Sequence, residues 1–361
     1  MTIYNFSAGP ATMPDPVIAQ IKQDLPSYND SGMSVMEISH RSELFEDIID
    51  QAEKDLRELL AIPDNYHVLF FQGGGTLQFT TIPLNLANKY HRIGLLDSGH
   101  WAERAGDEAK RVNVKVDVLN STKADHYTKL PILKDLTQDT YDYVHITTNN
   151  TIEGTAYSTV PDTGATELVG DMSSNFLGQQ YNIKDFGLIM AGAQKNLGIA
   201  GLTLVIVRDD LIGKVKNLPS MLDYQLFAQK NSMFNTPPVF AIYAAGLVLK
   251  WLKQQGGVPE MERRNRKKSS LLYDFLDASK LFTAPVQKPD RSLTNVPFVT
   301  KDADLDAKLI AEAADVGLLN IKGHRSVGGM RASLYNAMPY EGVEKLVNFL
   351  DKFEKNYWRT K

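Results

Sequence analysis

Short apolar segments alternate with amphipathic segments between about residue 60 and residue 210, and this alternation limits the folds that the chain can adopt. Each apolar segment has the length of a buried strand, and the segments between them have helical periodicity or are short crossovers. Strands that alternate with helices form a mostly parallel sheet with helices on both faces, so we predict an α/β fold. The predicted strands are His67–Gln72, Arg92–Asp97, Val114–Asn120, Tyr143–Asn149, Glu167–Met172, Leu188–Gln194 and Leu202–Val207.

The pattern changes near Pro237, where a long helix begins and the series of strands ends. A chain of 361 residues exceeds what one compact core usually holds, so we expect two domains. We predict a large domain of residues 1–256. Packing of its N-terminal segment against the small C-terminal domain is left open. Residues 257–361 form a smaller α+β domain. The predicted helices are Ser42–Ile62 with Ser42 as N-cap, one from about Thr76, Trp101–Val112, one after Pro238, about Pro259–Ser279, Leu305–Ala314 and a last helix.

Composition excludes several functional classes. The net charge is −4, so the chain has no electrostatic signature for nucleic acid or an anionic membrane. The basic run Glu262–Ser270 is best interpreted as the solvated face of a helix. The absence of cysteine removes disulfides, thiolate nucleophiles and thiolate metal sites, and we predict no metal site. With no signal-peptide pattern and no run long enough to span a membrane, we predict a cytoplasmic protein.

Lys195 stands two residues after the apolar segment Gly187–Ala193, in the stretch FGLIMAGAQKNLG. Lysine is rarely buried alone, because its ammonium group is costly to desolvate. Open α/β sheets bind ligands at the carboxyl ends of their strands, and Lys195 lies at such an end. Asp171 ends another strand, and Gly73–Gly75 lies between a strand and a helix, where backbone N–H groups and the helix dipole can bind phosphate.

One cofactor, pyridoxal phosphate, needs an amine, a carboxylate and a phosphate site together. Lysine holds its aldehyde covalently, an acid keeps its pyridine nitrogen protonated, and an anion site holds its phosphate. Trp101, at a helix start, is placed to stack on the ring. Taken singly, each feature has a more ordinary explanation: an exposed lysine, a capping aspartate or a tight turn. Together they favour a site for pyridoxal phosphate, since neither a Walker motif nor a complete dinucleotide motif is present.

Blocks of the sequence between residues 5 and 339 closely resemble the phosphoserine aminotransferase family, within the fold-type I, class V pyridoxal phosphate enzymes. The resemblance covers essentially the whole chain, and AGAQKN and GHRSVGGMRASLYNAMP are its most specific parts. The other blocks are NFSAGPATMP, SVMEISHRS, LFFQGGGT, NNTIEGT, GDMSSN, SMFNTPPVFAIY and NVPF.

The resemblance implies a role for each residue of the cofactor site. Lys195 matches the lysine that holds the cofactor, Asp171 the partner of the pyridine nitrogen, and Trp101 the residue stacked on the ring. The positions that match further contacts to the cofactor are Gly75, Thr76, Thr151, Gln194, Asn235 and Thr236. The last two match residues that reach the cofactor of the neighbouring subunit, which implies a homodimer.

The resemblance also implies a substrate site made of cations. Arg331 matches the residue that holds the substrate α-carboxylate. His40 and Arg41 match the pair that holds the distal anion, with His324 and Arg325 of the other subunit. The residue types support this independently, since arginine forks fit carboxylates and phosphates alike. A single His-Arg pair would more often be an exposed helix start.

Two positions depart from the common pattern of the family. Ala8 stands where many members have serine, so a hydroxyl contact to substrate is not expected. Thr76 stands where some members have arginine, so a charged contact is lost, although its N–H and hydroxyl remain. The segment Gly323–Gly329 is a candidate loop that closes over substrate, because its glycines allow hinging.

The expected activity is reversible transamination between L-glutamate and 3-phosphohydroxypyruvate, which gives 2-oxoglutarate and O-phospho-L-serine in serine biosynthesis. A second substrate, 4-phosphohydroxythreonine of pyridoxine biosynthesis, is open. The first alternative is another class V enzyme, such as an alanine–glyoxylate type aminotransferase; a desulfurase would need a cysteine. The second alternative is a nucleotide- or phosphosugar-binding protein, which would leave Lys195 and Asp171 without a role. A purely structural protein would not explain the paired charges.

Overall fold

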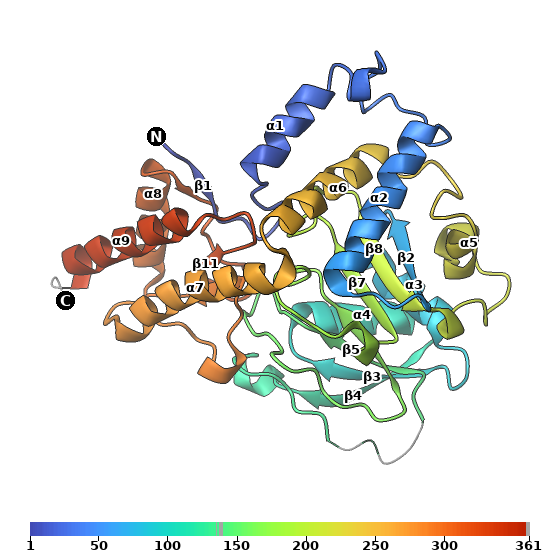
Figure 1. Ribbon diagram of the computed structural model, residues 1–361. Helices are drawn as coiled ribbons and strands as arrows, with labels where there is room; N and C mark the ends of the chain where they lie inside the picture. Colours follow the sequence, from blue (N-terminus) through green and yellow to red (C-terminus); the bar gives the residue numbers. More distant parts are fainter. Residues whose placement is uncertain (135, 137–139, 359–361) are drawn as a thin grey trace.

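A seven-stranded sheet forms the centre of the protein in a computed structural model that describes residues 1–134, 136 and 140–358 (Figure 1). The strand order is β2-β8-β7-β6-β5-β3-β4, and β8 runs antiparallel to both of its neighbours while the other pairs are parallel. The strands are β2 Tyr66–Phe71, β3 Arg92–Asp97, β4 Lys115–Ser121, β5 Tyr143–Thr147, β6 Glu167–Asp171, β7 Leu188–Gly192 and β8 Thr203–Arg208. The predicted mostly parallel α/β sheet is therefore confirmed.

Helices cover both faces of this sheet, and the alternation of side chains along β7 shows how. Ile189 and Ala191 join the core that lies under α2 (Glu43–Leu60) and α6 (Val239–Gln254). Leu188 and Met190 join the core on the opposite face, under α3 (Gly74–Leu86), α4 (His100–Arg111) and α5 (Tyr224–Gln229). Since successive side chains point to opposite faces, β7 must be apolar at every position.

A third apolar core lies beside the sheet domain and contains the C-terminal elements. Its strands β9 (Asn295–Phe298) and β11 (Met330–Ser333) pair antiparallel. The N-terminal strand β1 (Tyr4–Asn5) pairs with β10 (Leu318–Leu319), and Phe6 is fully buried in this core. Its helices are α7 Gly257–Ala278, α8 Ala303–Asp315 and α9 Tyr340–Tyr357. The division into domains at residue 256 stays a prediction.

Some elements differ in detail from the sequence expectation. Helix α1 (Asp15–Asp24) was not predicted, because Val17 is its one buried residue and no apolar stripe results. Ser42 is at the N-cap position of α2, but its hydroxyl donates to the Ser39 carbonyl (2.7 Å) and does not cap. No helix in the described ranges is apolar over a length that would cross a bilayer. Short 3-10 turns occupy Tyr28–Asp30, Lys123–Asp125, Ile183–Asp185, Asp209–Leu211, Ser220–Leu222 and Lys288–Asp290.

The strand register brings the ends of four strands to one edge of the sheet. Gly192 of β7 lies opposite Thr203, which lies opposite Phe71 at the end of β2. Asp171 at the end of β6 pairs with Met190 on one side and with Thr147 of β5 on the other. The turns that follow β2, β5, β6 and β7 therefore meet at this edge.

Candidate active site

Lys195 follows β7, and its amine lies at the edge of the sheet. Its Nζ donates a hydrogen bond to the Thr151 hydroxyl at 2.7 Å. The side chain keeps some exposed surface, yet protein atoms surround the amine closely enough for burial to lower its pKa to about 8. The nearby charge of Asp171 opposes this shift, and the charge of Arg331 adds to it. A substantial fraction of the amine is thus neutral and nucleophilic near neutral pH.

Asp171 is buried at the end of β6 and is held in place by the segment that follows it. Its Oδ1 accepts a hydrogen bond from the backbone N–H of Ser173 at 2.9 Å. The Ser173 hydroxyl in turn accepts from the backbone N–H of Gly192 at 3.1 Å. This pair of bonds ties the carboxylate to the end of β7, just before Lys195.

The turn from residue 150 to residue 155 joins the amine to the rest of the site. Its backbone is closed by bonds from Gly154 N to Asn150 O (2.8 Å) and from Asn150 N to Thr155 O (2.7 Å). The Thr151 side chain accepts from Lys195, and the Thr151 carbonyl accepts from Nη1 of Arg331 at 3.2 Å. One residue therefore contacts both the amine and the guanidinium group.

Glu153 in the same turn is buried, and it reaches the start of α4. Its Oε1 accepts from the backbone N–H of His100 at 2.9 Å. A Cβ atom at Gly99 would lie 2.6 Å from this carboxylate, so only glycine allows the approach. Burial raises the pKa of Glu153, while the His100 N–H and the charge of Arg331 lower it.

Arg331 of β11 has unused hydrogen-bonding capacity at the site. Its Nε is buried and makes no hydrogen bond to any described residue. Burial also lowers the pKa of the guanidinium group from its ordinary value. A desolvated guanidinium with free donors binds carboxylates strongly, because two of its N–H groups can donate at once to the two carboxylate oxygens.

Trp101, Phe79 and His145 form an aromatic cluster close to Asp171. The ring centroids of Phe79 lie 6.5 Å from Trp101 and 6.1 Å from His145. The Trp101 Nε1 and the His145 Nε2 are buried without a hydrogen bond in the part of the chain that the structure describes. Burial lowers the pKa of His145 to about 4 against the opposing charge of Asp171, so this imidazole is neutral.

His324 and Arg325 lie in the turn before β11, close to Arg331. The backbone N–H of Ser326 donates to the His324 Nδ1 at 3.3 Å, and the Ser326 hydroxyl lies 2.7 Å from the same atom. The His324 ring centroid is 6.0 Å from that of His100. Burial lowers the pKa of His324, and the charges of Arg331, His100 and Arg325 lower it further. The closure of this turn over substrate stays a prediction.

The predicted phosphate residues lie at the start of α3 and beside Lys195. Gly73 adopts a left-handed φ of 88° and precedes α3, and no side chain caps the helix start. A Cβ at Gly75 would lie 3.5 Å from Met190 of β7, so Gly75 sits directly over the strand that leads to Lys195, and Thr76 after it is exposed. The Gln194 carbonyl accepts from the N–H of Ala11 at 2.9 Å, which brings the N-terminal segment alongside.

Four predicted residues are not joined to Lys195 within this chain. The Thr236 carbonyl accepts from the side chain of Gln72 at 3.0 Å, so Asn235 and Thr236 lie near the glycine turn after β2. His40 and Arg41 precede α2, and among the described residues no hydrogen bond or ion pair connects them to the site.

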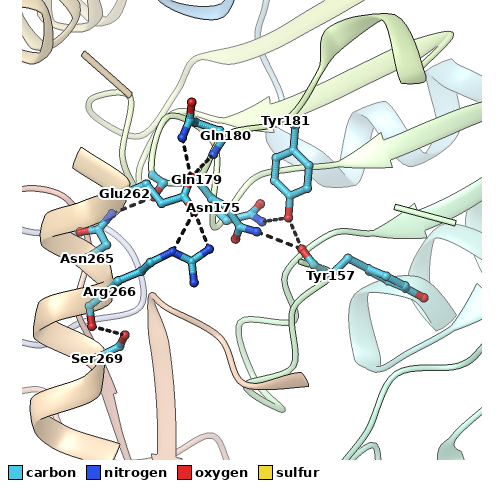
Figure 2. Close-up of polar contacts among 10 residues, drawn as sticks. Tyr157, Asn175, Gln179, Gln180, Tyr181, Glu262, Asn265, Arg266 and Ser269 are labelled. Atoms are coloured by element: carbon cyan, nitrogen blue, oxygen red, sulfur yellow. Dashed lines mark hydrogen bonds and ion pairs between the residues drawn. The ribbon is translucent and has the colours of Figure 1, made fainter. Parts of the chain in front are cut away.

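A polar network holds the segment after Asp171 against α7 (Figure 2). The backbone N–H of Gln180 donates to Glu262 (2.8 Å), and the Asn265 side chain donates to the Gly178 carbonyl (3.0 Å). The Tyr181 hydroxyl donates to the Tyr157 carbonyl (2.5 Å) and accepts from Asn175. The sequence-based prediction assigned Glu262–Ser270 to a solvated helix face, but Glu262 and Asn265 are buried contacts.

Sequence reasoning missed three residues of the site: His100, His145 and Glu153. His145 lies on a predicted strand and His100 stands directly before Trp101, so a search for titratable residues beside the predicted cofactor residues would have found both. Glu153 lies in the block NNTIEGT, but nothing in the sequence indicates that it contacts a helix start 53 residues away.

These residues fit pyridoxal phosphate. A partly neutral amine, a buried carboxylate and an uncapped helix start meet at one edge of the sheet. The Trp101 Nε1 and the Arg331 Nε are buried donors that no described residue satisfies. Each of the cofactor's reactive groups thus has a residue of matching chemistry.

The class V aminotransferase family matches residues 3–346 of the chain. A phosphoserine aminotransferase of Lactiplantibacillus plantarum is 68% identical over 357 residues, which is 99% of this chain and 100% of the relative. One of Listeria monocytogenes is 56% identical over 97% of this chain and 96% of the relative. The solved structure of phosphoserine aminotransferase from Bacillus circulans subsp. alkalophilus is 42% identical and superposes with a TM-score of 0.95, covering 98% of this chain and 99% of that chain.

A structure described as pyridoxal phosphate-bound phosphoserine aminotransferase from Trichomonas vaginalis is 36% identical, with a TM-score of 0.93 and coverage of 97% of this chain and 100% of that chain. The chain belongs to the phosphoserine aminotransferase family. The predicted family, fold and enzyme class are confirmed.

Proposed function

We propose that the chain transfers an amino group reversibly between L-glutamate and 3-phosphohydroxypyruvate, with 2-oxoglutarate and O-phospho-L-serine as the other pair. The observation that carries the proposal is the contact of Thr151 with both Lys195 and Arg331. It places an amine of lowered pKa beside a guanidinium group that fits an α-carboxylate. The 68% identity over essentially the full length supports the same substrates.

The cofactor is pyridoxal phosphate, which supplies an aldehyde that carries the amino group and a ring that accepts electrons from the substrate Cα. Asp171 would keep the pyridine nitrogen protonated, and Trp101 would shield the ring from water. Gly75, Thr76 and Gln194 would hold the phosphate, and Thr151 would contact the phenolic oxygen side of the ring.

Lys195 moves the proton of the reaction. Lys195 would hold the cofactor between turnovers, and its amine, when free, would act as the base that moves the proton of the substrate Cα. Arg331 fixes the α-carboxylate, and thereby the direction of the Cα–H bond. Two half-reactions that share one amino-group carrier predict ping-pong kinetics.

A homodimer is part of the proposal. His40 and Arg41 directly precede α2, and as the resemblance implies they would complete the distal anion site of a partner. Asn235 and Thr236 would reach the partner's cofactor phosphate in the same way. His324 and Arg325 would meet His40 and Arg41 across the interface. Sedimentation should give twice the chain mass of 40.3 kDa. The cytoplasmic location and the use of 4-phosphohydroxythreonine stay predictions from the sequence.

The decisive experiment supplies O-phosphoserine and 2-oxoglutarate to the purified protein and measures glutamate. Alanine in place of phosphoserine tests the alanine–glyoxylate alternative. Lys195→Ala should abolish turnover and covalent capture of the cofactor by borohydride. Lys184→Ala, which removes an exposed lysine, should leave both intact. Equal use of alanine, or activity in Lys195→Ala, would contradict the proposal.

A further inference from the structure

His100 lies among the cations of the site, although nothing in the sequence pattern assigns it a role. It is the first residue of α4 and its side chain is exposed. Its ring centroid lies 5.2 Å from Trp101 and 6.0 Å from His324. It therefore stands between the residue proposed to cover the cofactor and a residue proposed to bind the distal anion.

The position of His100 is fixed by its backbone. Glu153 accepts the His100 N–H at 2.9 Å, and Gly99 allows this close contact. The carboxylate already occupies the helix start, so an incoming anion cannot use that N–H group. What His100 offers to a substrate is its imidazole side chain.

His324 is set up as a neutral donor. A backbone N–H can only donate, so the bond from Ser326 N makes the His324 Nδ1 an acceptor. The proton of the neutral ring is then on Nε2, which can donate to an anion. Protonation of Nδ1 would break the Ser326 contact, and Arg331 and Arg325 also disfavour a second charge there.

The two substrates differ in charge at this end of the site. The γ-carboxylate of glutamate carries one negative charge, whereas the phosphate of phosphoserine carries between 1.5 and 2 at about pH 7. A pocket with fixed charge cannot balance both. A histidine can, because it gains a proton when a dianion binds and loses it when a monoanion replaces the dianion.

We propose that His100 is a substrate-binding residue that gains a proton when the phosphate group binds, and that it favours phosphate over carboxylate in this chain. The inference rests on the proposed function and adds a specificity residue to it. The titratable neighbours of His100 are Glu153 from the turn after β5, which accepts its N–H, and His324 from the turn before β11. Glu103 and Arg331 act on Glu153, and Arg331 and Arg325 act on His324.

The first test compares His100→Gln with the wild-type holoenzyme at pH 6.5 and pH 8.5. Glutamine keeps the size and polarity but cannot be protonated. At pH 6.5 the KM for phosphoserine should rise about twofold to fivefold, the upper part of the range for an exposed charge pair. At pH 8.5 it should approach the wild-type value, and the KM for glutamate should change less than about twofold at either pH. The matched control is His91→Gln, an exposed histidine before β3 at the other end of the strands.

The second test uses sulfate, which stays a dianion over this pH range, and does not depend on turnover. Calorimetry in two buffers of different ionisation enthalpy gives the number of protons taken up on binding. On binding sulfate at pH 6.5, the wild-type protein should take up a fraction of a proton, and His100→Gln should not. Equal proton uptake in both proteins, or equal effects on phosphoserine and glutamate, would overturn the role of His100. A wild-type protein inactive on phosphoserine would instead overturn the proposed function, and the sulfate measurement would still decide on His100.

Discussion

The pKa of Lys195 should control how fast the protein without cofactor captures pyridoxal phosphate. The neutral amine attacks the aldehyde, so the rate depends on the neutral fraction. At pH 7.5, a pKa of about 8 leaves roughly a quarter of the amine neutral, against about one part in a thousand at the ordinary value of 10.5. Burial should therefore speed capture roughly 200-fold at this pH.

The assay mixes cofactor-free protein with pyridoxal phosphate between pH 6 and pH 10, stops the reaction early with borohydride, and quantifies the modified Lys195 peptide by mass. The initial rate should rise with a midpoint near pH 8 and then level off. A rate that continues to rise to pH 10 would refute the argument. Lys184→Ala should give the wild-type curve.

Two variants that remove charges near Lys195 should shift its pKa in opposite directions. Asp171→Asn removes a negative charge that favours the protonated amine, so the midpoint should move to lower pH. Arg331→Gln removes a positive charge that disfavours it, so the midpoint should move to higher pH. Shifts in the same direction would show that the two charges do not act on Lys195 as the geometry requires.

Two further predictions concern stability. Lys268 is buried and donates to three backbone carbonyls of the segment 334–338 at 2.8 to 3.1 Å; burial lowers its pKa to about 7. The unfolded chain binds this proton more tightly than the folded protein does. Raising the pH from 7 to 9 should therefore raise the free energy of unfolding of the wild type by about 2 kcal/mol relative to that of Lys268→Met, as measured by urea unfolding. A difference between the two proteins that stays constant with pH would contradict this. Gly154→Ala places a Cβ at φ 83° and 2.3 Å from Pro297 and should cost roughly 2–4 kcal/mol in the same assay; an unchanged midpoint would show that the turn relaxes freely.

The sheet and Lys195 could be predicted from the sequence because their signals are local. A strand buried on both faces is apolar at every position, and Leu188–Gly192 is such a strand. An ionisable residue directly after it is conspicuous for the same reason. The position of Asp171 at the end of a strand suggested its role and the resemblance supported it, whereas the role of Arg331 came from the resemblance alone. Both charges act on Lys195 in the structure.

The remaining features depend on contacts between distant parts of the chain. His100 and His324 lie next to each other in space but 224 residues apart in sequence, and no periodicity connects them. Lys268 looks like part of a solvated basic run, although its amine is surrounded by carbonyls contributed by residues 66 to 70 positions later. Helix α1 buries a single residue, so its sequence carries almost no amphipathic signal.

The pairing of β1 with β10 has a consequence for how the chain is made. Tyr4 leaves the ribosome early, but its partner Leu318 is synthesised 314 residues later. At synthesis rates of about 5–20 residues per second, roughly 15–60 s pass between the synthesis of Phe6 and that of the residues it packs against. During that interval the first segment is an unpaired apolar end. The sheet domain can fold ahead of it, but β11, which carries Arg331, and the Ala8–Tyr335 contact cannot form until nearly the whole chain has emerged.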